Sequence, residues 1–204
     1  MAHRVEWYFQ RYGDLELHRR MIADRARTDA FARAIAEVVK PTHRVLDLGT
    51  GTGVLAMLAA KAGAKKVDAI DRADIADVAT HLVKANKLQK KVTIHKGLAT
   101  DLKLDHSVDL IISEWLGHFA LVEGMLDDLC AVRDSHMAQG GFLLPSHVQM
   151  MLAPVDDPVL YMRDGPGFWR EPIHGLDFST LEKMERDQSH AVQLRIDASS
   201  LLSG

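Results

Sequence analysis

The chain has 204 residues, 47% of them hydrophobic and 26% charged, which suits one globular domain with at most a small appendage. Its formal net charge of −3 provides no broad basic surface, so direct binding of nucleic acid is not expected. No run of about eighteen apolar residues could span a membrane, and no apolar segment follows the N-terminal charges as in a secretion signal, so we expect a cytoplasmic protein.

The predicted elements begin with helices. Residues 15–39 carry apolar side chains at the spacing of one or two helices that pack on a sheet, and Pro41 follows their end. Four short apolar runs come next and predict buried strands. These strands are expected at residues 44–48, 66–70, 92–95 and 108–112, with helices at 54–62 and 75–85 between them. The alternation of strands and helices predicts an α/β fold with a doubly wound, mostly parallel sheet.

Toward the end of the chain the regular alternation of strands and helices is lost. Residues 125–137 predict another helix that ends at Gly140 and Gly141, and residues 142–144 predict a strand that Pro145 closes. Beyond it we expect a strand, a loop, a short helix and a last strand at residues 147–154, 165–169, 179–186 and 191–196. These residues are too few for an independent barrel. The predicted division is therefore 1–40 for N-terminal helices, 41–146 for the sheet domain and 147–204 for the appendage.

Three glycines, Gly49, Gly51 and Gly53, alternate between the first strand and the helix after it. Such glycines let the backbone turn sharply and approach a ligand closely, and the helix supplies free N–H groups. The third glycine comes one residue earlier than in the dinucleotide fingerprint, which disfavours NAD. Asp71 ends the second strand, where its carboxylate could accept hydrogen bonds from both hydroxyls of a ribose. The alternative for Asp71 is a helix cap in the turn at 71–74.

Two glutamates, Glu114 and Glu123, lie in the segment that follows the strand at 108–112. In open α/β sheets, ligands bind in the crevice outside the carboxyl ends of the strands. A segment that brings two carboxylates to that edge is suited to hold a cation. The alternative is that both side chains are simply solvated.

These features in this order resemble the protein arginine N-methyltransferases over roughly residues 6–190. Residues 113–117, Ser-Glu-Trp-Leu-Gly, are similar to the family's SEWMG, and residues 123–126, Glu-Gly-Met-Leu, to its ESML. Residues 45–67 resemble its motif I region, and residues 8–12, Tyr-Phe-Gln-Arg-Tyr, its YFxxY helix. The resemblance implies a Rossmann-like class I S-adenosylmethionine-dependent methyltransferase, with N-terminal lid helices, a truncated C-terminal barrel and a short β and arm appendage.

The resemblance also implies a role for each candidate residue. Glu114 and Glu123 would clamp the guanidinium of a substrate, and Tyr12, Trp115 and Met125 would line its pocket. Arg27 would pair with the methionyl carboxylate of the cofactor. Thr100 stands where the family commonly has an acidic residue for the adenine amino group. The full set implied to bind the cofactor is His18, Met21, Arg27, Gly49, Gly51, Asp71 and Thr100, and no metal is implied.

Residues 159–187, with Phe168 and Trp169, resemble the family's dimerisation arm and imply a homodimer. The alternative is an arm folded back on its own domain. The family's THW loop, which lies beside the substrate, has no counterpart in this sequence. We therefore expect methyl transfer from S-adenosylmethionine to an arginine-containing protein or a small guanidine. Two alternatives stay open: a methyltransferase of small amines or guanidines, and a non-catalytic relative that acts as an interaction module.

Overall fold

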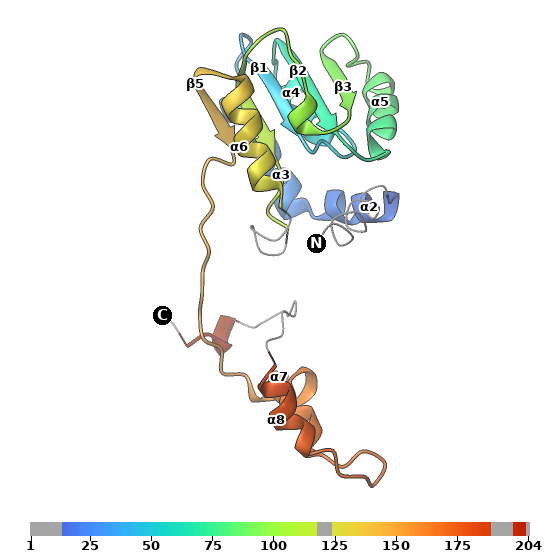
Figure 1. Cartoon of the computed structure of the whole chain (residues 1–204), viewed down its shortest axis with the longest axis vertical. Coiled ribbons are helices and arrows are strands. Elements are labelled where there is room, and N and C mark those ends of the chain that lie inside the picture. Colours follow the sequence, from blue (N-terminus) through green and yellow to red (C-terminus); the bar gives the residue numbers. More distant parts are fainter. Residues whose placement is uncertain (1–13, 118–123, 189–197, 203–204) are drawn as a thin grey trace. The chain divides into compact units, whose positions relative to one another are not determined.

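The computed structural model describes residues 14–117, 124–188 and 198–202, and it divides into two compact units, Met1–Val148 and Gln149–Gly204 (Figure 1). Each unit is described by itself. None of the helices in these described ranges has the length and apolar character that a membrane crossing requires.

The first unit is built on one parallel sheet of five strands. In chain order the strands are β1 (Arg44–Leu48), β2 (Lys66–Asp71), β3 (Val92–Lys96), β4 (Val108–Ser113) and β5 (Met137–Leu144). In space their order is β3-β2-β1-β4-β5. The chain thus starts in the middle of the sheet and winds outward in both directions, which confirms the predicted doubly wound α/β class. All carboxyl ends of the strands meet at one edge.

Helices cover both faces of this sheet, and each face has its own apolar core (Figure 1). On one face α3 (Arg25–Val38), α4 (Val54–Lys61) and α5 (Ile75–Ala85) contribute Ile35, Leu55 and Val83 to a common cluster. On the other face α6 (Met125–His136) contributes Leu129 to a cluster with Leu46 of β1. A side chain buried as fully as Ile35, which is 0% exposed, stabilises the fold by about 1.5–3 kcal/mol. Burial on both faces explains why these strands read as continuous apolar runs.

The predicted N-terminal helical region consists of two helices joined at one aspartate. Helix α2 (Leu15–Ala23) ends at Asp24, and Asp24 also caps α3, because its side chain accepts a hydrogen bond from the backbone N–H of Arg27 at 3.2 Å. The extended residue Val39 ends α3 shortly before Pro41. The junction places Arg27 in the first turn of α3.

Two predictions for the region after β4 are wrong. Helix α6 ends at His136 and β5 begins at the next residue, so Gly140 and Gly141 lie inside a strand and do not end the helix. A Cβ on Gly141 would lie 3.1 Å from the backbone oxygen of Asp109, so the glycine allows strands β4 and β5 to approach each other closely. The strand expected at residues 147–154 is not formed. Only its end has a partner, because the N–H of Leu202 donates a hydrogen bond to the backbone oxygen of Pro154 at 3.0 Å and Val155 forms an isolated antiparallel bridge with Leu201.

The second unit contains short helices: α7 (Pro158–Asp164), the 3-10 helix η2 (Pro166–Arg170), α8 (Thr180–Arg186) and the 3-10 helix η3 (Ala198–Ser200). The helix expected at 179–186 is confirmed, whereas the loop expected at 165–169 is a 3-10 helix. Helix α7 was not predicted. It starts where the Asp157 side chain accepts a hydrogen bond from the N–H of Leu160 at 2.9 Å and Pro158 takes the first helical position. The strand expected at 191–196 lies outside the described residues.

Candidate active site

A cleft lies at the carboxyl edge of the sheet in the first unit. Residues from α2, α3 and α6 line it, together with the loops that follow β1, β2, β3 and β4. The structure thus brings most of the predicted site residues to one place. Those that line the cleft are His18, Met21, Arg27, Gly49, Gly51, Asp71, Glu114 and Met125.

The glycine loop forms the floor of the cleft between two helices. Gly49 and Gly51 have φ angles of 71° and 54°, which side chains rarely adopt. A Cβ on Gly51 would lie 2.7 Å from Cε1 of His18, and a Cβ on Gly49 would lie 2.7 Å from Cε of Met125. His18 comes from α2 and Met125 from α6. The backbone conformation therefore favours glycine at both positions, and at Gly51 a side chain would also collide with the ring of His18.

Asp47, which sequence analysis did not single out, fixes the conformation of the glycine loop through hydrogen bonds. Its Oδ2 accepts hydrogen bonds from Oγ1 of Thr50 at 2.6 Å and from the backbone N–H of Ala56 at 2.9 Å. The carboxyl group is buried, and burial raises its pKa to about 6 against the opposing effect of these two hydrogen bonds. An acidic residue inside an otherwise apolar buried strand is the signal that could have identified it.

Asp71 joins the end of β2 to the glycine loop. Its Oδ2 accepts a hydrogen bond from the N–H of Gly51 at 2.8 Å, and its Oδ1 accepts one from the N–H of Ala73 at 2.9 Å. Each carboxylate oxygen has a second lone pair, so both can still accept hydrogen bonds from ligand hydroxyls. The contact with Ala73 closes a local turn and is not the helix cap of the alternative interpretation, because the N-cap residue of α5 is Asp74. This turn and the binding of a ligand are compatible at Asp71.

Arg27 and Glu114 form an ion pair across the cleft. The distance from Nη1 of Arg27 to Oε2 of Glu114 is 2.6 Å, and the two side chains are 32% and 19% exposed. The other carboxylate oxygen, Oε1, accepts a hydrogen bond from the N–H of Leu116 at 3.1 Å. Helix α3 supplies the cation, and the segment after β4 supplies the anion. The Glu114 carboxylate is thus oriented by its own backbone and already binds a guanidinium.

Two of the predicted site residues with described positions, Trp115 and Thr100, do not line the cleft. The Trp115 side chain is only 7% exposed and packs in the core on the α6 face of the sheet, because a large indole gains most from burial there. Thr100 lies in η1 (Ala99–Asp101) and lines a separate small pocket with Ser135 and His136. Tyr12 and Glu123 lie outside the described residues.

Other residues line the cleft although the sequence did not single them out. Ala99 and Asp128 are two of them, from η1 and α6. Among the residues with described positions, no group of three or more histidine, cysteine, aspartate or glutamate side chains is arranged to hold a metal ion. The cleft therefore offers carboxylates, the guanidinium groups of Arg27 and Arg72, and apolar walls to a ligand.

Comparison with known proteins gives consistent matches. The family model for ribosomal protein L11 methyltransferase (PrmA) matches residues 26–146. A probable protein arginine N-methyltransferase 6 from Arabidopsis thaliana is 40% identical over 181 residues, which are 88% of this chain and 41% of that protein.

Solved structures agree with the sequence matches. The PRMT1 enzyme–prozyme heterotetrameric complex of Trypanosoma brucei with AdoHcy superposes with a TM-score of 0.77 at 34% identity, over 86% of this chain and 55% of that one. Protein arginine methyltransferase 10 of Arabidopsis thaliana superposes with a TM-score of 0.72 at 36% identity, over 88% and 55%. The chain thus spans about half the length of these relatives.

Proposed function

We propose that this chain transfers a methyl group from S-adenosylmethionine to a guanidinium nitrogen of arginine. The chain belongs to the methyltransferase family whose model it matches and, through its relatives, to the protein arginine N-methyltransferases. The observation that carries the proposal is the position of Glu114. Its carboxylate binds a guanidinium at 2.6 Å in the same cleft as the glycine loop and Asp71.

The cleft has the groups that fit this cofactor. Asp71 offers two acceptor oxygens at the end of β2 for a ribose diol, and Arg27 offers a cation for a carboxylate. The glycine loop allows close approach of a ligand, and Met21 and Phe31 add apolar lining. When bound, S-adenosylmethionine supplies an electrophilic methyl group on its sulfonium.

Glu114 would activate the substrate by orienting it. A guanidinium is a weak nucleophile because its nitrogen lone pairs are delocalised and it is always charged. A carboxylate that binds two of its nitrogens draws positive charge toward them and leaves the third as the nucleophile. The negative charge of Glu114 also offsets repulsion between two cations held in one cleft. Glu123 would complete this clamp, on the strength of the resemblance alone.

Glu114 is also placed to accept the proton that the methylated nitrogen releases. The N–H of Leu116 holds its Oε1, so the carboxylate keeps one orientation while Oε2 exchanges partners. Arg27 would move its bond from Oε2 to the carboxylate of the cofactor, or share it, when a substrate guanidinium arrives. The ion pair in this structure supports the proposed clamp, because it shows that the Glu114 carboxylate is able to bind a guanidinium.

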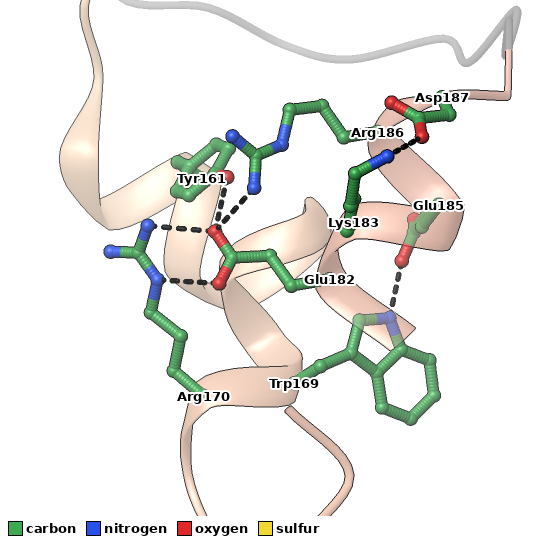
Figure 2. Close-up of polar contacts among 8 residues, drawn as sticks. All are labelled: Tyr161, Trp169, Arg170, Glu182, Lys183, Glu185, Arg186 and Asp187. Atoms are coloured by element: carbon green, nitrogen blue, oxygen red, sulfur yellow. Dashed lines mark hydrogen bonds and ion pairs between the residues drawn. The ribbon is translucent and has the colours of Figure 1, made fainter. Parts of the chain in front are cut away.

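The arm in the second unit would form the homodimer contact. Its inner face is held together by Glu182, whose carboxylate accepts hydrogen bonds from Tyr161 at 2.9 Å and from Arg170 at 2.7 and 3.0 Å (Figure 2). The described part of the arm also exposes large apolar side chains, including Leu176 at 62% and Met184 at 58%. An ordered helical arm with exposed apolar side chains is suited to bind a second copy of the chain.

A methylation assay tests the proposed activity. The full chain is incubated with S-adenosylmethionine and an arginine-rich peptide, and with the same peptide carrying lysine in place of arginine. We expect methylation of the arginine peptide only. Glu114→Gln should lower the rate by about 100-fold or more while leaving the affinity for S-adenosylhomocysteine within about threefold.

The control for charge removal is Glu37→Gln on the exposed face of α3, which should leave the rate unchanged. Methylation of free guanidines or amines in place of peptides would support a small-molecule enzyme instead. Failure to bind S-adenosylmethionine at all would refute the activity and leave only an interaction module.

A further inference from the structure

No residue at one end of the cleft takes part in the proposed chemistry. The strand order places the loops after β4, β1, β2 and β3 in that sequence along the cleft. Arg27 and Glu114 lie at the β4 end, and Asp71 lies at the end of β2. The backbone N–H of Gly97 donates a hydrogen bond to the backbone oxygen of Asp71 at 3.0 Å, so the segment after β3 runs directly beside Asp71. The β3 end therefore lies beyond the ribose position, on the side away from Glu114.

Helix α6 brings a carboxylate to this end. Leu129 and Val132 of α6 share an apolar cluster with Ala99 and Leu102, which holds α6 against η1. Asp128 follows Met125 by three positions, so the two side chains lie on the same face of the helix, and both line the cleft. The result is a third carboxylate in the lining, in addition to Asp71 and Glu114.

On the basis of the proposed function, we infer that Asp128 recognises the exocyclic amino group of the cofactor's adenine and sets the specificity for that base. The remaining end of the cofactor, once the ribose is at Asp71 and the carboxylate at Arg27, is the purine ring. Leu98, 47% exposed, and Ala99 give that ring apolar contact. An ionised carboxylate only accepts hydrogen bonds, so Asp128 favours a ring that carries an N–H donor over one that carries a carbonyl oxygen.

Thr100 does not compete for this role. It belongs to η1 like Ala99, but Ala99 lines both pockets whereas Thr100 lines only the separate one with Ser135 and His136. Asp127 supplies the matched comparison. It shares the first turn of α6 with Asp128, where both charges stabilise the helix N-terminus, but it does not line the cleft. Any effect through the helix should therefore appear in variants of either residue.

Calorimetric titration of the full chain with S-adenosylhomocysteine and S-inosylhomocysteine tests the inference. The two compounds differ at the purine, where an oxygen replaces the amino group. We expect the wild-type chain to bind the adenosyl compound about 10- to 100-fold more tightly. In Asp128→Asn the preference should fall to within about threefold, because an amide can turn its N–H toward the carbonyl oxygen. Asp127→Asn should keep the wild-type preference.

The outcomes separate this inference from the proposed function. If the wild-type chain binds neither compound, the proposed function is wrong and the inference fails with it. If it binds both but Asp128→Asn keeps the wild-type preference, only the inference is refuted. An equal loss of preference in Asp127→Asn would also refute it, because the effect would then come from the helix and not from contact with the base.

Discussion

Asp47 shows how one side chain connects the stability of the fold to the cleft. It is the fourth of the five residues of β1, accepts hydrogen bonds from Thr50 and Ala56, and so fixes the start of α4 relative to the glycine loop. Its other oxygen, Oδ1, has no hydrogen-bond partner within the described residues. A buried carboxylate with incomplete bonding is costly when it is ionised. The position thus serves the geometry of the loop at a cost in stability.

We predict that this cost depends on pH. Because the pKa of Asp47 is raised to about 6, the folded chain keeps this proton at pH values where the unfolded chain has released it. Stability from this group is therefore greatest below about pH 4 and is lost as the pH rises to about 6, by up to about 3 kcal/mol. Asp47→Asn removes the titration but keeps an acceptor oxygen. Urea unfolding of both proteins between pH 4 and 7 should show the variant gaining stability relative to wild type as pH rises.

Other carboxylates titrate in both proteins, so they cancel in the difference between the two curves. An unsatisfied amide at position 47 would shift the variant's curve by a constant amount without changing its pH dependence. Parallel curves over this range would show that Asp47 titrates normally in the folded chain.

Arg27 is predicted to bind only the methionyl carboxylate of the cofactor and no other part of it. Arg27→Ala removes the guanidinium, so S-adenosylhomocysteine, which has a methionyl-type carboxylate, should bind about 10- to 100-fold more weakly. Methylthioadenosine, which lacks that carboxylate, should bind nearly as well as to wild type. Calorimetry with both ligands measures the difference, and Arg33→Ala on the exposed side of α3 is the control. Equal weakening of both ligands would mean that Arg27 acts by positioning α3.

At the scale of elements, the arm is ordered by a few side chains between α7, η2 and α8. Arg170 stacks over the ring of Tyr161 at 5.3 Å and also binds Glu182 with two nitrogens, while the Trp169 indole N–H donates to Glu185 (Figure 2). Helices of this length are not stable alone in water. The polar contacts drawn in Figure 2, together with the packing of Trp169 against Phe168 and Phe178, therefore stabilise the arm.

The Glu182 contacts predict an acid-sensitive arm. Hydrogen bonds from Arg170, and then from Tyr161, lower the pKa of Glu182 to about 2, although its side chain is 14% exposed. A lowered pKa means that its contribution is fully present above about pH 4.5 and is lost as the pH falls toward 2. Glu182→Gln should mimic the protonated state at neutral pH and speed hydrogen exchange in α7 and α8. Glu171→Gln, exposed beside the network, should not change exchange.

Most strands could be predicted from the sequence, and the exceptions have physical causes. Strands β1 to β4 are buried on both faces or packed under helices, so their apolar runs mark them clearly. The start of β5 was missed because Gly140 and Gly141 read as a helix end, although they serve the close approach to Asp109. The segment at 147–154 reads as a strand, yet Leu152 is 99% exposed in the structure. An apolar pattern indicates that a segment can form a strand, but it does not show whether a neighbouring strand is present to pair with it.

At the scale of the whole molecule, the sequence could predict the edge of the sheet at which the site forms but not every side chain in it. Gly51, Asp71 and Glu114 follow three different strands, and a parallel sheet necessarily brings such positions together. The sequence pointed to Thr100, which does not line the cleft, and not to Asp128, which does. The reason is that the direction of a side chain in a short 3-10 helix, and the packing of α6 on it, depend on tertiary contacts. Predicting such contacts requires the folded core.

We predict that the first unit folds and binds its ligand independently of the second unit. Every residue that lines the cleft lies within Met1–Val148, whereas the arm lies within Gln149–Gly204. A chain that ends at Val148 should therefore unfold cooperatively and bind S-adenosylhomocysteine within about threefold of the full chain. If the arm forms the homodimer, the full chain should sediment as a dimer and the shortened chain as a monomer.

Point variants of the full chain distinguish loss of an interface from loss of the unit. Leu176→Ser and Met184→Ser replace exposed apolar side chains of the arm, so together they should weaken the dimer about 10-fold or more without lowering the melting temperature of the first unit. Leu82→Ser, at a residue 36% exposed on α5, is the control and should leave the dimer intact. A shortened chain that still dimerises would place the contact in the first unit, because the arm would then be unnecessary for assembly.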